Sequence, residues 1–318
     1  MKVVVTDYDF PDLALERELA AEAGVELAAA QARTPAEVVE AAEGADALLV
    51  QYAQVDRSVF EALDLTAVGR YGIGVDSVDL DAATEHGVRV LNVPAYCLDE
   101  VSTHAFALLL ACVRKVARYD REIRDGRWDW TVAKPIHRFG GGTLGLAGFG
   151  KIPRELGRRA SAFDLDVIAY DPYVDADEMA DHGVTKVDFD ALLDRSDFVS
   201  VHVPLTDETR HLFDARAFER MNDDAIIVNT SRGATVDVRA LHDALRDEEL
   251  AGAGIDVMPE EPPEYTALFD RDEVVCTPHV AWYSEESYEE LRRTVTRDVL
   301  GVLRGDDPEH LVNTAVDG

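Results

Sequence analysis

The sequence predicts an α/β protein with two parallel β-sheets, each covered by helices on both faces. Three observations lead to this fold class. Apolar runs of strand length alternate with helix-length stretches that mix apolar and polar residues. The alternation is interrupted once, after Pro94, and then begins again. The chain of 318 residues, 47% of them hydrophobic, is longer than one typical domain and has enough apolar residues for two cores.

The first series alternates four strands with three helices. Two of these helices are followed by a glycine, Gly24 or Gly87, the residue that most readily ends a helix. We predict strands at 3–6, 47–52, 68–72 and 88–92, and helices at 13–23, 58–63 and 80–86.

The second series begins with a long helix. Apolar residues recur at helical spacing from Ala105 to Val116, and we predict one helix over 100–127. Strands are predicted at 143–148, 167–170, 198–202, 225–229, 254–257 and 274–277, with helices at 154–163, 189–193, 215–221 and 238–247. A last helix over 285–304 is expected to return to the first domain. The predicted domains are therefore 1–98 plus 284–318, and 99–283.

The chain has a net charge of −32, because 31 basic residues face 63 acidic ones. The acids are scattered along the whole chain, so the charge belongs to the entire surface. Nucleic acid and anionic membranes would repel this surface, and we expect neither as a partner. Molar salt shortens the Debye length to about 3 Å and screens such self-repulsion. We therefore hypothesise a halophilic protein.

Other sequence features limit the location and the metal chemistry. No apolar stretch is long enough to span a bilayer, and the N-terminus resembles a strand rather than a signal peptide. Cys97, Cys112 and Cys276 form no disulfide framework, and buried thiols are expected, which favours a reducing cytoplasm. No His or Cys pair has the spacing of a zinc site, so no metal is expected.

A glycine turn between a predicted strand and helix indicates a nucleotide site. In the segment LGLAGFGKIP, Gly148 and Gly150 would allow the backbone to approach a pyrophosphate at a helix N-terminus. The third glycine of the usual pattern is Pro153. Proline suits the first turn of a helix, but the close packing that this glycine normally gives is then in doubt.

Asp171 ends the strand that follows this turn. It lies 23 residues after Gly148 (171 − 148), near the spacing of the acid that accepts hydrogen bonds from an adenosine ribose. Such an acid repels a 2′-phosphate, which favours NAD over NADP. Asp171 could instead be a turn residue before Pro172.

Three charged residues end apolar runs in the last third of the chain: Arg232 in VNTSRGA, Glu261 in IDVMPEEP and His279 in TPH. An arginine can bind a carboxylate through two hydrogen bonds, and a histidine can exchange a proton near neutral pH. A carboxylate partner holds the imidazole in one tautomer and favours its charged form. These groups suit the reduction of a 2-keto acid. From the residues alone, Glu260 is an alternative to Glu261.

Together these motifs resemble those of the D-2-hydroxyacid dehydrogenase family over nearly the whole chain. The segments RYGIGVDSVD from Arg70 and VHVPLTDET from Val201 add to the likeness. YDPY from Tyr170 and HVAWYS from His279 look most like the C-terminal-binding-protein branch. The resemblance implies a flavodoxin-like substrate domain and a Rossmann NAD-binding domain.

The resemblance also implies roles for individual residues. Arg232 would bind the substrate carboxylate and keto oxygen, His279 would donate the proton, and Glu261, which directly precedes a proline as in the family, would keep His279 charged. Substrate contacts would come from Arg70, from the backbone near Ile73 and Gly74, and from Trp282. Cofactor contacts would come from Gly148, Phe149, Gly150, Lys151, Ile152, Asp171, Val203, Pro204, Thr209, Thr230, Ser231 and Asp256.

Two alternatives to a 2-keto acid reductase remain at this point. The likeness to the C-terminal-binding-protein branch suggests an NAD(H)-sensing interaction protein, and a short-form phosphoglycerate dehydrogenase is also possible. The family resemblance implies a homodimer, for which the helix over 100–127 and the WDW segment at Trp128 are candidate surfaces.

Overall fold

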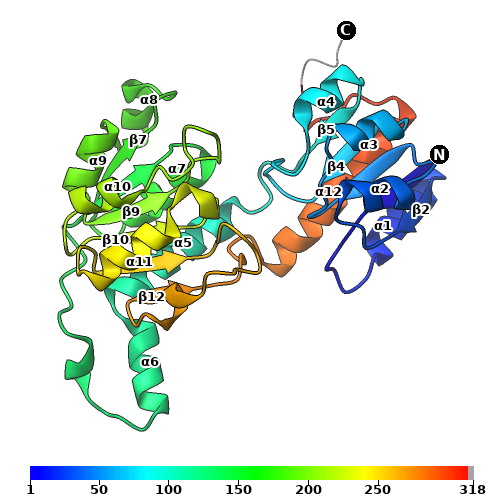
Figure 1. Ribbon diagram of the computed structural model, residues 1–318. Helices are drawn as coiled ribbons and strands as arrows, with labels where there is room; N and C mark the ends of the chain where they lie inside the picture. Colours follow the sequence, from blue (N-terminus) through cyan, green and yellow to red (C-terminus); the bar gives the residue numbers. More distant parts are fainter. Residues whose placement is uncertain (314–318) are drawn as a thin grey trace. The chain divides into compact units, whose positions relative to one another are not determined.

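The computed structural model describes residues 1–313, which form two compact units. One unit comprises Met1–Tyr96 and the segment that begins at Ser284, and the other comprises Cys97–Tyr283. Each unit has one parallel β-sheet with helices on both faces (Figure 1). The predicted fold class of two parallel-sheet α/β units is confirmed. The last residues of the predicted segment 284–318 lie outside the described part of the chain.

The first unit has five strands in the order β2-β1-β3-β4-β5, all parallel, which is the flavodoxin-like order. Its elements are β1 (Lys2–Val5), α1 (Ala14–Ala23), β2 (Glu26–Ala29), α2 (Pro35–Ala41), β3 (Ala47–Val50), α3 (Arg57–Ala62), β4 (Ala67–Arg70), α4 (Leu80–Glu85), β5 (Arg89–Leu91) and α12 (Glu285–Arg304).

Two elements of the first unit were not predicted. β2 is an edge strand with no buried residue, so its side chains lack the apolar alternation that predicts a strand. α2 begins with a capping box in which the Thr34 side chain accepts from the Glu37 N–H and Glu37 accepts from the Thr34 N–H. This start signal was present in the sequence, but only Val38 is buried in the helix.

The C-terminal helix α12 packs into the first unit, as expected. A Cβ atom at Gly69 of β4 would lie only 2.5 Å from Cγ2 of Val299, so glycine allows this close approach. Arg292 of α12 donates to both carboxylate oxygens of Glu16 on α1, at 2.7 and 2.6 Å. Both side chains are buried, and the ion pair fixes α12 against α1.

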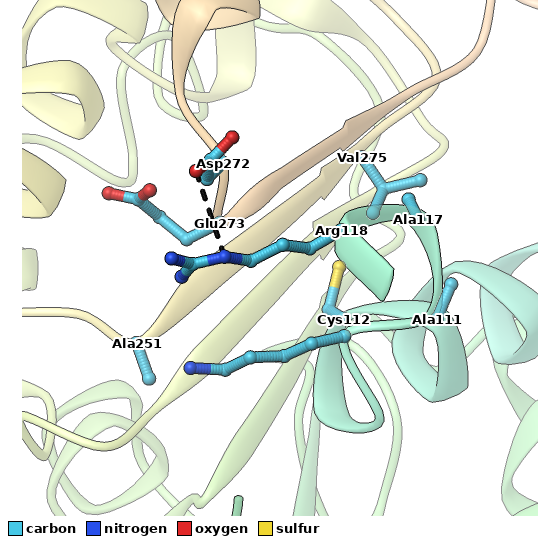
Figure 2. A pocket seen from close by; sticks show the side chains of 9 residues that line it. Ala111, Cys112, Ala117, Arg118, Ala251, Asp272, Glu273 and Val275 are labelled. Atoms are coloured by element: carbon cyan, nitrogen blue, oxygen red, sulfur yellow. Dashed lines mark ion pairs between the residues drawn. The ribbon is translucent and has the colours of Figure 1, made fainter. Parts of the chain in front are cut away.

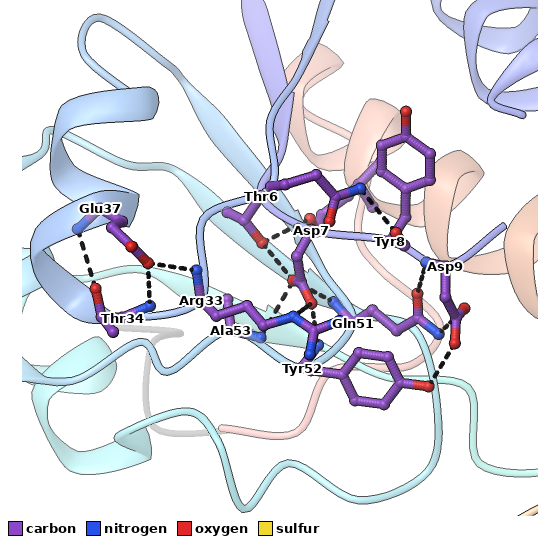
Figure 3. A network of polar contacts seen from close by, with 12 residues as sticks. Thr6, Asp7, Tyr8, Asp9, Arg33, Thr34, Glu37, Gln51, Tyr52 and Ala53 are labelled. Carbon is purple, nitrogen blue, oxygen red and sulfur yellow. Dashed lines mark hydrogen bonds and ion pairs between the residues drawn. The ribbon is translucent and has the colours of Figure 1, made fainter. Parts of the chain in front are cut away.

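A buried carboxylate at the C-terminal end of β1 fixes the loop that follows β3. Asp7 accepts hydrogen bonds from the backbone N–H groups of Gln51, Tyr52 and Ala53, at 2.8 to 3.2 Å. Asp9, two residues further on, accepts from the Tyr52 hydroxyl at 2.9 Å (Figure 3). Charged acceptors of this kind satisfy backbone donors at a point where the chain leaves the sheet.

The second unit has seven parallel strands in the order β12-β11-β10-β9-β6-β7-β8. Counted within the unit, the first six follow the Rossmann order 3-2-1-4-5-6. The elements are α5 (Leu98–Val113), α6 (Val116–Arg124), η1 (Trp130–Ala133), β6 (Thr143–Ala147), α7 (Lys151–Ser161), β7 (Asp166–Tyr170), α8 (Ala176–Asp181), β8 (Thr185–Lys186), α9 (Phe189–Arg195), β9 (Phe198–Val201), α10 (Ala215–Arg220), β10 (Ile226–Asn229), η2 (Gly233–Thr235), α11 (Val238–Arg246), β11 (Gly252–Ile255), η3 (Ala267–Asp270) and β12 (Val274–Cys276).

The predicted single helix over 100–127 is wrong. It is divided into α5 and α6 at Lys115, whose φ of 51° is left-handed. α5 buries an apolar face that includes Leu108 and Cys112, whereas α6 has no buried residue and extends away from the sheet (Figure 1). The apolar spacing that justified a helix therefore ends where packing against the sheet ends.

Contacts with the segment before β12 hold α6 in place. Arg118 and Arg121 both lie near Asp272, with N···O distances of 3.7 and 2.5 Å (Figure 2 shows the first). The cavity beside Arg118 has a volume of about 10 Å³, room for about one water molecule, so it is no ligand site.

The thiols are less uniform than expected. Cys97 and Cys112 are buried, but Cys276 is exposed, because its strand lies at the edge of the sheet. Over residues 1–313, no helix is long and apolar enough to cross a membrane. The same residues contain no group of three or more His, Cys, Asp or Glu that could hold a metal ion.

Candidate active site

The glycine turn lies where the strand order of the second sheet reverses. Gly148 follows β6, and its neighbour across the sheet is the end of β9, which leads to His202. Parallel α/β sheets bind ligands at this reversal, outside the carboxyl ends of the strands. Gly148 has a φ of 97°, and a Cβ there would lie 2.8 Å from the His202 carbonyl oxygen. Only glycine fits where the turn after β6 passes this close to the backbone at the end of β9.

His202 is a neutral neighbour of the turn. Burial lowers the pKa of His202 to about 3, so the imidazole carries no charge at neutral pH. Its Nε2 lies 2.8 Å from the Ser200 hydroxyl. The uncharged ring can line a nucleotide site without adding a cation.

Gly150 and the start of α7 have the geometry of a pyrophosphate site. A Cβ at Gly150 would meet no described atom within 4 Å, so packing within the chain does not require a glycine at this position. In this motif the second glycine allows the pyrophosphate to approach the backbone. Pro153 is buried in the first turn of α7. One turn later Gly157 faces Leu146 and Val167, so a small residue still lies between helix and strands.

Asp171 follows β7 and organises two loops. Its carboxylate accepts from the Phe149 N–H of the glycine turn at 2.9 Å and from the Tyr173 N–H at 2.9 Å. The second bond is that of a turn residue, the alternative considered for this position. The first ties the acid to the nucleotide turn, so the two interpretations of Asp171 are compatible.

The remaining predicted cofactor residues lie on loops after β9 and β10. Thr209 closes the loop that begins at Val203 and Pro204, because its hydroxyl donates to the Pro204 carbonyl at 2.6 Å. The Thr230 hydroxyl is buried and has no hydrogen-bond partner among residues 1–313. A buried hydroxyl of this kind suits a bound polar group, and the loops therefore fit a dinucleotide.

Asn229 at the end of β10 shapes the loop that carries Arg232. Its side chain donates to the Arg232 carbonyl at 3.0 Å and accepts from the Ser231 N–H at 3.0 Å. Asn229 lies in the motif VNTSRGA, but no role was predicted for it. Its signal was an amide at a strand end, a position where polar side chains commonly fix loops.

Gly233 brings the Arg232 loop against the loop that carries Glu261. A Cβ at Gly233 would lie 2.0 Å from the carbonyl carbon of Met258, so no larger residue fits. The Met258 N–H donates to Glu261 Oε1 at 3.0 Å, which orients the carboxylate. Two loops far apart in sequence are thereby held together.

Glu261 and His279 form a hydrogen-bonded pair. Oε2 of Glu261 lies 2.7 Å from Nδ1 of His279, and both side chains are partly exposed. Burial alone would raise the pKa of Glu261. The hydrogen bond and charge of His279, the Met258 N–H and the charge of Arg232 outweigh burial and hold the pKa below its usual value. The structure therefore brings Arg232, Glu261 and His279 together.

Asp256 and Trp282 both contact the turn around His279. The Asp256 carboxylate is buried and accepts from the N–H groups of Val280 and Ala281, each at 2.9 Å. The Trp282 indole N–H donates to the His279 carbonyl at 3.0 Å.

Arg70, Ile73 and Gly74 belong to the first unit, where Arg70 ends β4 and the other two lie on the loop that follows it. Gly72 has a φ of 147°, and the Arg70 guanidinium folds over it, with Nη1 only 1.3 Å from the position of a Cβ. The Asn92 side chain donates to the Ile73 carbonyl at 2.6 Å. Asn92 was not predicted, because the contact joins two loops that sequence spacing does not relate.

Residues 106–281 match the model of the D-isomer specific 2-hydroxyacid dehydrogenase family, NAD binding domain. The chain belongs to this family. A D-3-phosphoglycerate dehydrogenase from Methanocaldococcus jannaschii is 36% identical over 316 residues, which are 98% of this chain and 59% of the relative. A glyoxylate reductase from Korarchaeum cryptofilum is 38% identical over 286 residues, 88% of this chain and 86% of the relative. This chain therefore spans only about three fifths of the first relative's length.

A solved structure of similar fold agrees with this assignment. The D-lactate dehydrogenase from Aquifex aeolicus, in complex with NAD and lactic acid, has a TM-score of 0.89 and 25% sequence identity, with 98% of this chain and 99% of that chain covered. The predicted family and NAD as its nucleotide are confirmed. The roles of single residues stay predictions.

Proposed function

We propose that this chain is an NAD-dependent oxidoreductase that interconverts a 2-keto acid and a D-2-hydroxy acid. The observation that carries the proposal is the His279–Glu261 pair beside the Arg232 loop, in the unit that matches the NAD-binding domain. Bound NADH would supply the hydride that reduces the keto carbon.

The residues of the chain would stabilise the charge that develops on the keto oxygen. Glu261 occupies Nδ1 of His279, which leaves Nε2 to donate a proton to that oxygen. The fixed cation of Arg232 would bind the substrate carboxylate and the same oxygen. In the oxidative direction Nε2 would take the proton back from the hydroxyl.

The first unit has predicted substrate contacts of its own. In that unit the Arg70 guanidinium is a predicted carboxylate ligand, and the backbone N–H groups near Ile73 and Gly74 are predicted neutral donors. Trp282 would contact the substrate from the turn that holds His279. The D-lactate dehydrogenase of similar fold is described in complex with lactic acid, which supports a small hydroxy acid as ligand.

A substrate panel tests the proposal. Glyoxylate, hydroxypyruvate, pyruvate and 3-phosphohydroxypyruvate are offered with NADH or NADPH at molar salt, and loss of absorbance at 340 nm is followed. Turnover of one of them with NADH is expected. Preference for the phosphorylated acid would favour the phosphoglycerate dehydrogenase alternative, which the Methanocaldococcus relative suggests. No turnover of any 2-keto acid would contradict the proposal.

The sensing alternative predicts a different result. An NAD(H)-sensing interaction protein would bind NADH and capture a partner protein without turnover. The intact set of Arg232, Glu261 and His279 favours the enzyme, because binding a nucleotide alone does not require an acid–base pair.

We further propose a homodimer formed through the segment around α6 and η1. α6 has no buried residue, and Trp128 and Trp130 are 90% and 70% exposed. An exposed apolar patch of this kind is typical of an interface. Light scattering at high salt should give twice the chain mass, and Trp128→Glu should reduce it. Tyr173→Glu, at another exposed aromatic residue, is the matched control and should leave the mass unchanged.

The acidic surface supports our proposal of a halophilic protein, and the free thiols of Cys97, Cys112 and Cys276 support a reducing cytoplasm. With a net charge of −32, stability should rise with KCl concentration as repulsion is screened. Thermal unfolding in dilute buffer and in molar KCl measures this effect. Equal stability in both would contradict the halophilic assignment.

A further inference from the structure

A chain of hydrogen bonds behind His279 begins on helix α5. Nε2 of His104 lies 2.9 Å from the Thr277 hydroxyl oxygen, and that hydroxyl lies 2.5 Å from Oδ1 of Asp256. A carboxylate can only accept, so the Thr277 hydrogen points to Asp256. The Thr277 oxygen must then accept from His104, which assigns the proton of His104 to Nε2.

This chain of bonds ends on the turn that presents His279. The Asp256 carboxylate accepts from the N–H groups of Val280 and Ala281, while the Asp256 carbonyl accepts from the His279 N–H at 2.7 Å. Thr277, which precedes His279, and Val280, which follows it, therefore both donate to the buried carboxylate of Asp256.

The turn needs this support because its backbone is strained. His279 has a φ of 54°, in the left-handed region that is unfavourable for a non-glycine residue. Such a conformation persists only when its surroundings fix it. The same conformation directs the imidazole to Glu261.

Asp256 depends in turn on His104. The carboxylate is fully buried, and Nε2 of His104 lies 3.6 Å from its Oδ1. Without the Nε2–H donor, the Thr277 hydroxyl would be free to rotate away from Asp256. The carboxylate would then lose a donor and could shift from the Val280 and Ala281 N–H groups.

We propose that His104 is a positioning residue for His279, acting through Thr277 and Asp256. It touches neither substrate nor cofactor in this role. The proposal rests on the proposed function for its kinetic consequence, but the geometry of the turn is independent of that function. It also gives Asp256 a role different from the cofactor contact implied by the family resemblance.

Two pairs of variants test the proposal. His104→Leu removes the N–H donor and Thr277→Val removes the hydroxyl. His104→Gln keeps an N–H donor at the first position, and Thr277→Ser keeps a hydroxyl at the second. We expect the first pair to lower kcat roughly 10- to 100-fold, because small displacements of a catalytic group have effects of this size. The Kd of NADH should stay within about twofold, and the second pair should recover most of the loss. The double variant His104→Leu/Thr277→Val should have a kcat no lower than that of either single variant, because both changes break the same chain of hydrogen bonds.

A readout other than activity separates this proposal from the proposed function. In a Trp128→Phe/Trp130→Phe background, Trp282 is the remaining tryptophan, and its indole is bonded to the His279 carbonyl. His104→Leu should lower the fluorescence anisotropy of Trp282, and His104→Gln should restore it. If the parent protein reduces no 2-keto acid, the proposed function fails. The anisotropy of Trp282 then decides by itself whether His104 positions the His279 turn. Unchanged anisotropy, an unchanged kcat, or a loss confined to NADH affinity would overturn the role of His104.

Discussion

Nδ1 of His279 lies 2.7 Å from Oε2 of Glu261, so one ring nitrogen is committed to the carboxylate and the other can exchange a proton. We expect His279→Ala to lower kcat/KM by roughly 10²- to 10⁴-fold, the usual contribution of a general acid. NADH binding should be unaffected, because the imidazole is not among the predicted cofactor contacts. Near-normal turnover would rule out His279 as the proton donor.

The same pair makes a prediction about acid. Burial would raise the pKa of Glu261, but the hydrogen bond from His279 and the nearby charges hold this pKa below its usual value. A carboxylate whose pKa is lowered by folding stabilises the folded state fully at pH values above its pKa in the unfolded chain. This stabilisation is lost as the pH falls through the lower pKa of the folded state. Glu261 should therefore remain ionised at pH 5. In Glu261→Gln, the pH profile of kcat/KM should move to lower pH, because the neutral amide no longer favours the imidazolium. An unmoved profile would contradict the pairing.

Two glycines should behave differently when replaced by alanine. A Cβ at Gly233 would lie 2.0 Å from the Met258 backbone, whereas one at Gly150 would meet no described atom within 4 Å. Gly233→Ala should separate the Arg232 and Glu261 loops, lowering kcat and the unfolding temperature. Gly150→Ala should fold normally and weaken NADH binding, because its Cβ would obstruct the pyrophosphate. Normal kcat in Gly233→Ala would contradict the close approach of the two loops.

Asp171 is expected to select NADH over NADPH. Replacing it with serine removes the negative charge next to the predicted ribose position, and the preference for NADH should fall by about tenfold or more. Asp175→Ser, an exposed acid two residues beyond Tyr173, is the matched control and should keep the preference. Kinetics with both nucleotides measure the ratio. An unchanged ratio in Asp171→Ser would leave Asp171 with its turn role alone.

Asn92 should influence substrate binding without touching the substrate. Its amide holds the Ile73 carbonyl at 2.6 Å, and in a trans peptide the following Gly74 N–H points the opposite way. Asn92 therefore fixes the direction of one predicted carboxylate donor. Asn92→Ala should raise KM for the keto acid by roughly tenfold and leave the Kd of NADH unchanged. An unchanged KM would show that the Gly74 N–H does not bind the carboxylate.

Local signals in the sequence were sufficient for most of the elements. The glycine turn at Gly148, the strand before Asp171 and the helix ended by Gly24 all lie where their residue types predict them. The prediction failed where packing ended within one continuous helical pattern, at Lys115. It also missed β2, because an edge strand buries too little to show an apolar alternation.

The sequence by itself determined the fold class, the family and the nucleotide, because apolar periodicity and loop motifs depend on residues that are near one another in the chain. It also supplied Arg232, Glu261 and His279 as candidates. The tertiary structure alone decided which side chains support them. Gly233 against Met258, Asn92 on Ile73, and His104 through Thr277 to Asp256 join residues from separate loops and helices. Such contacts depend on which strand ends meet at the edge of a sheet, and no spacing along the chain encodes that distance.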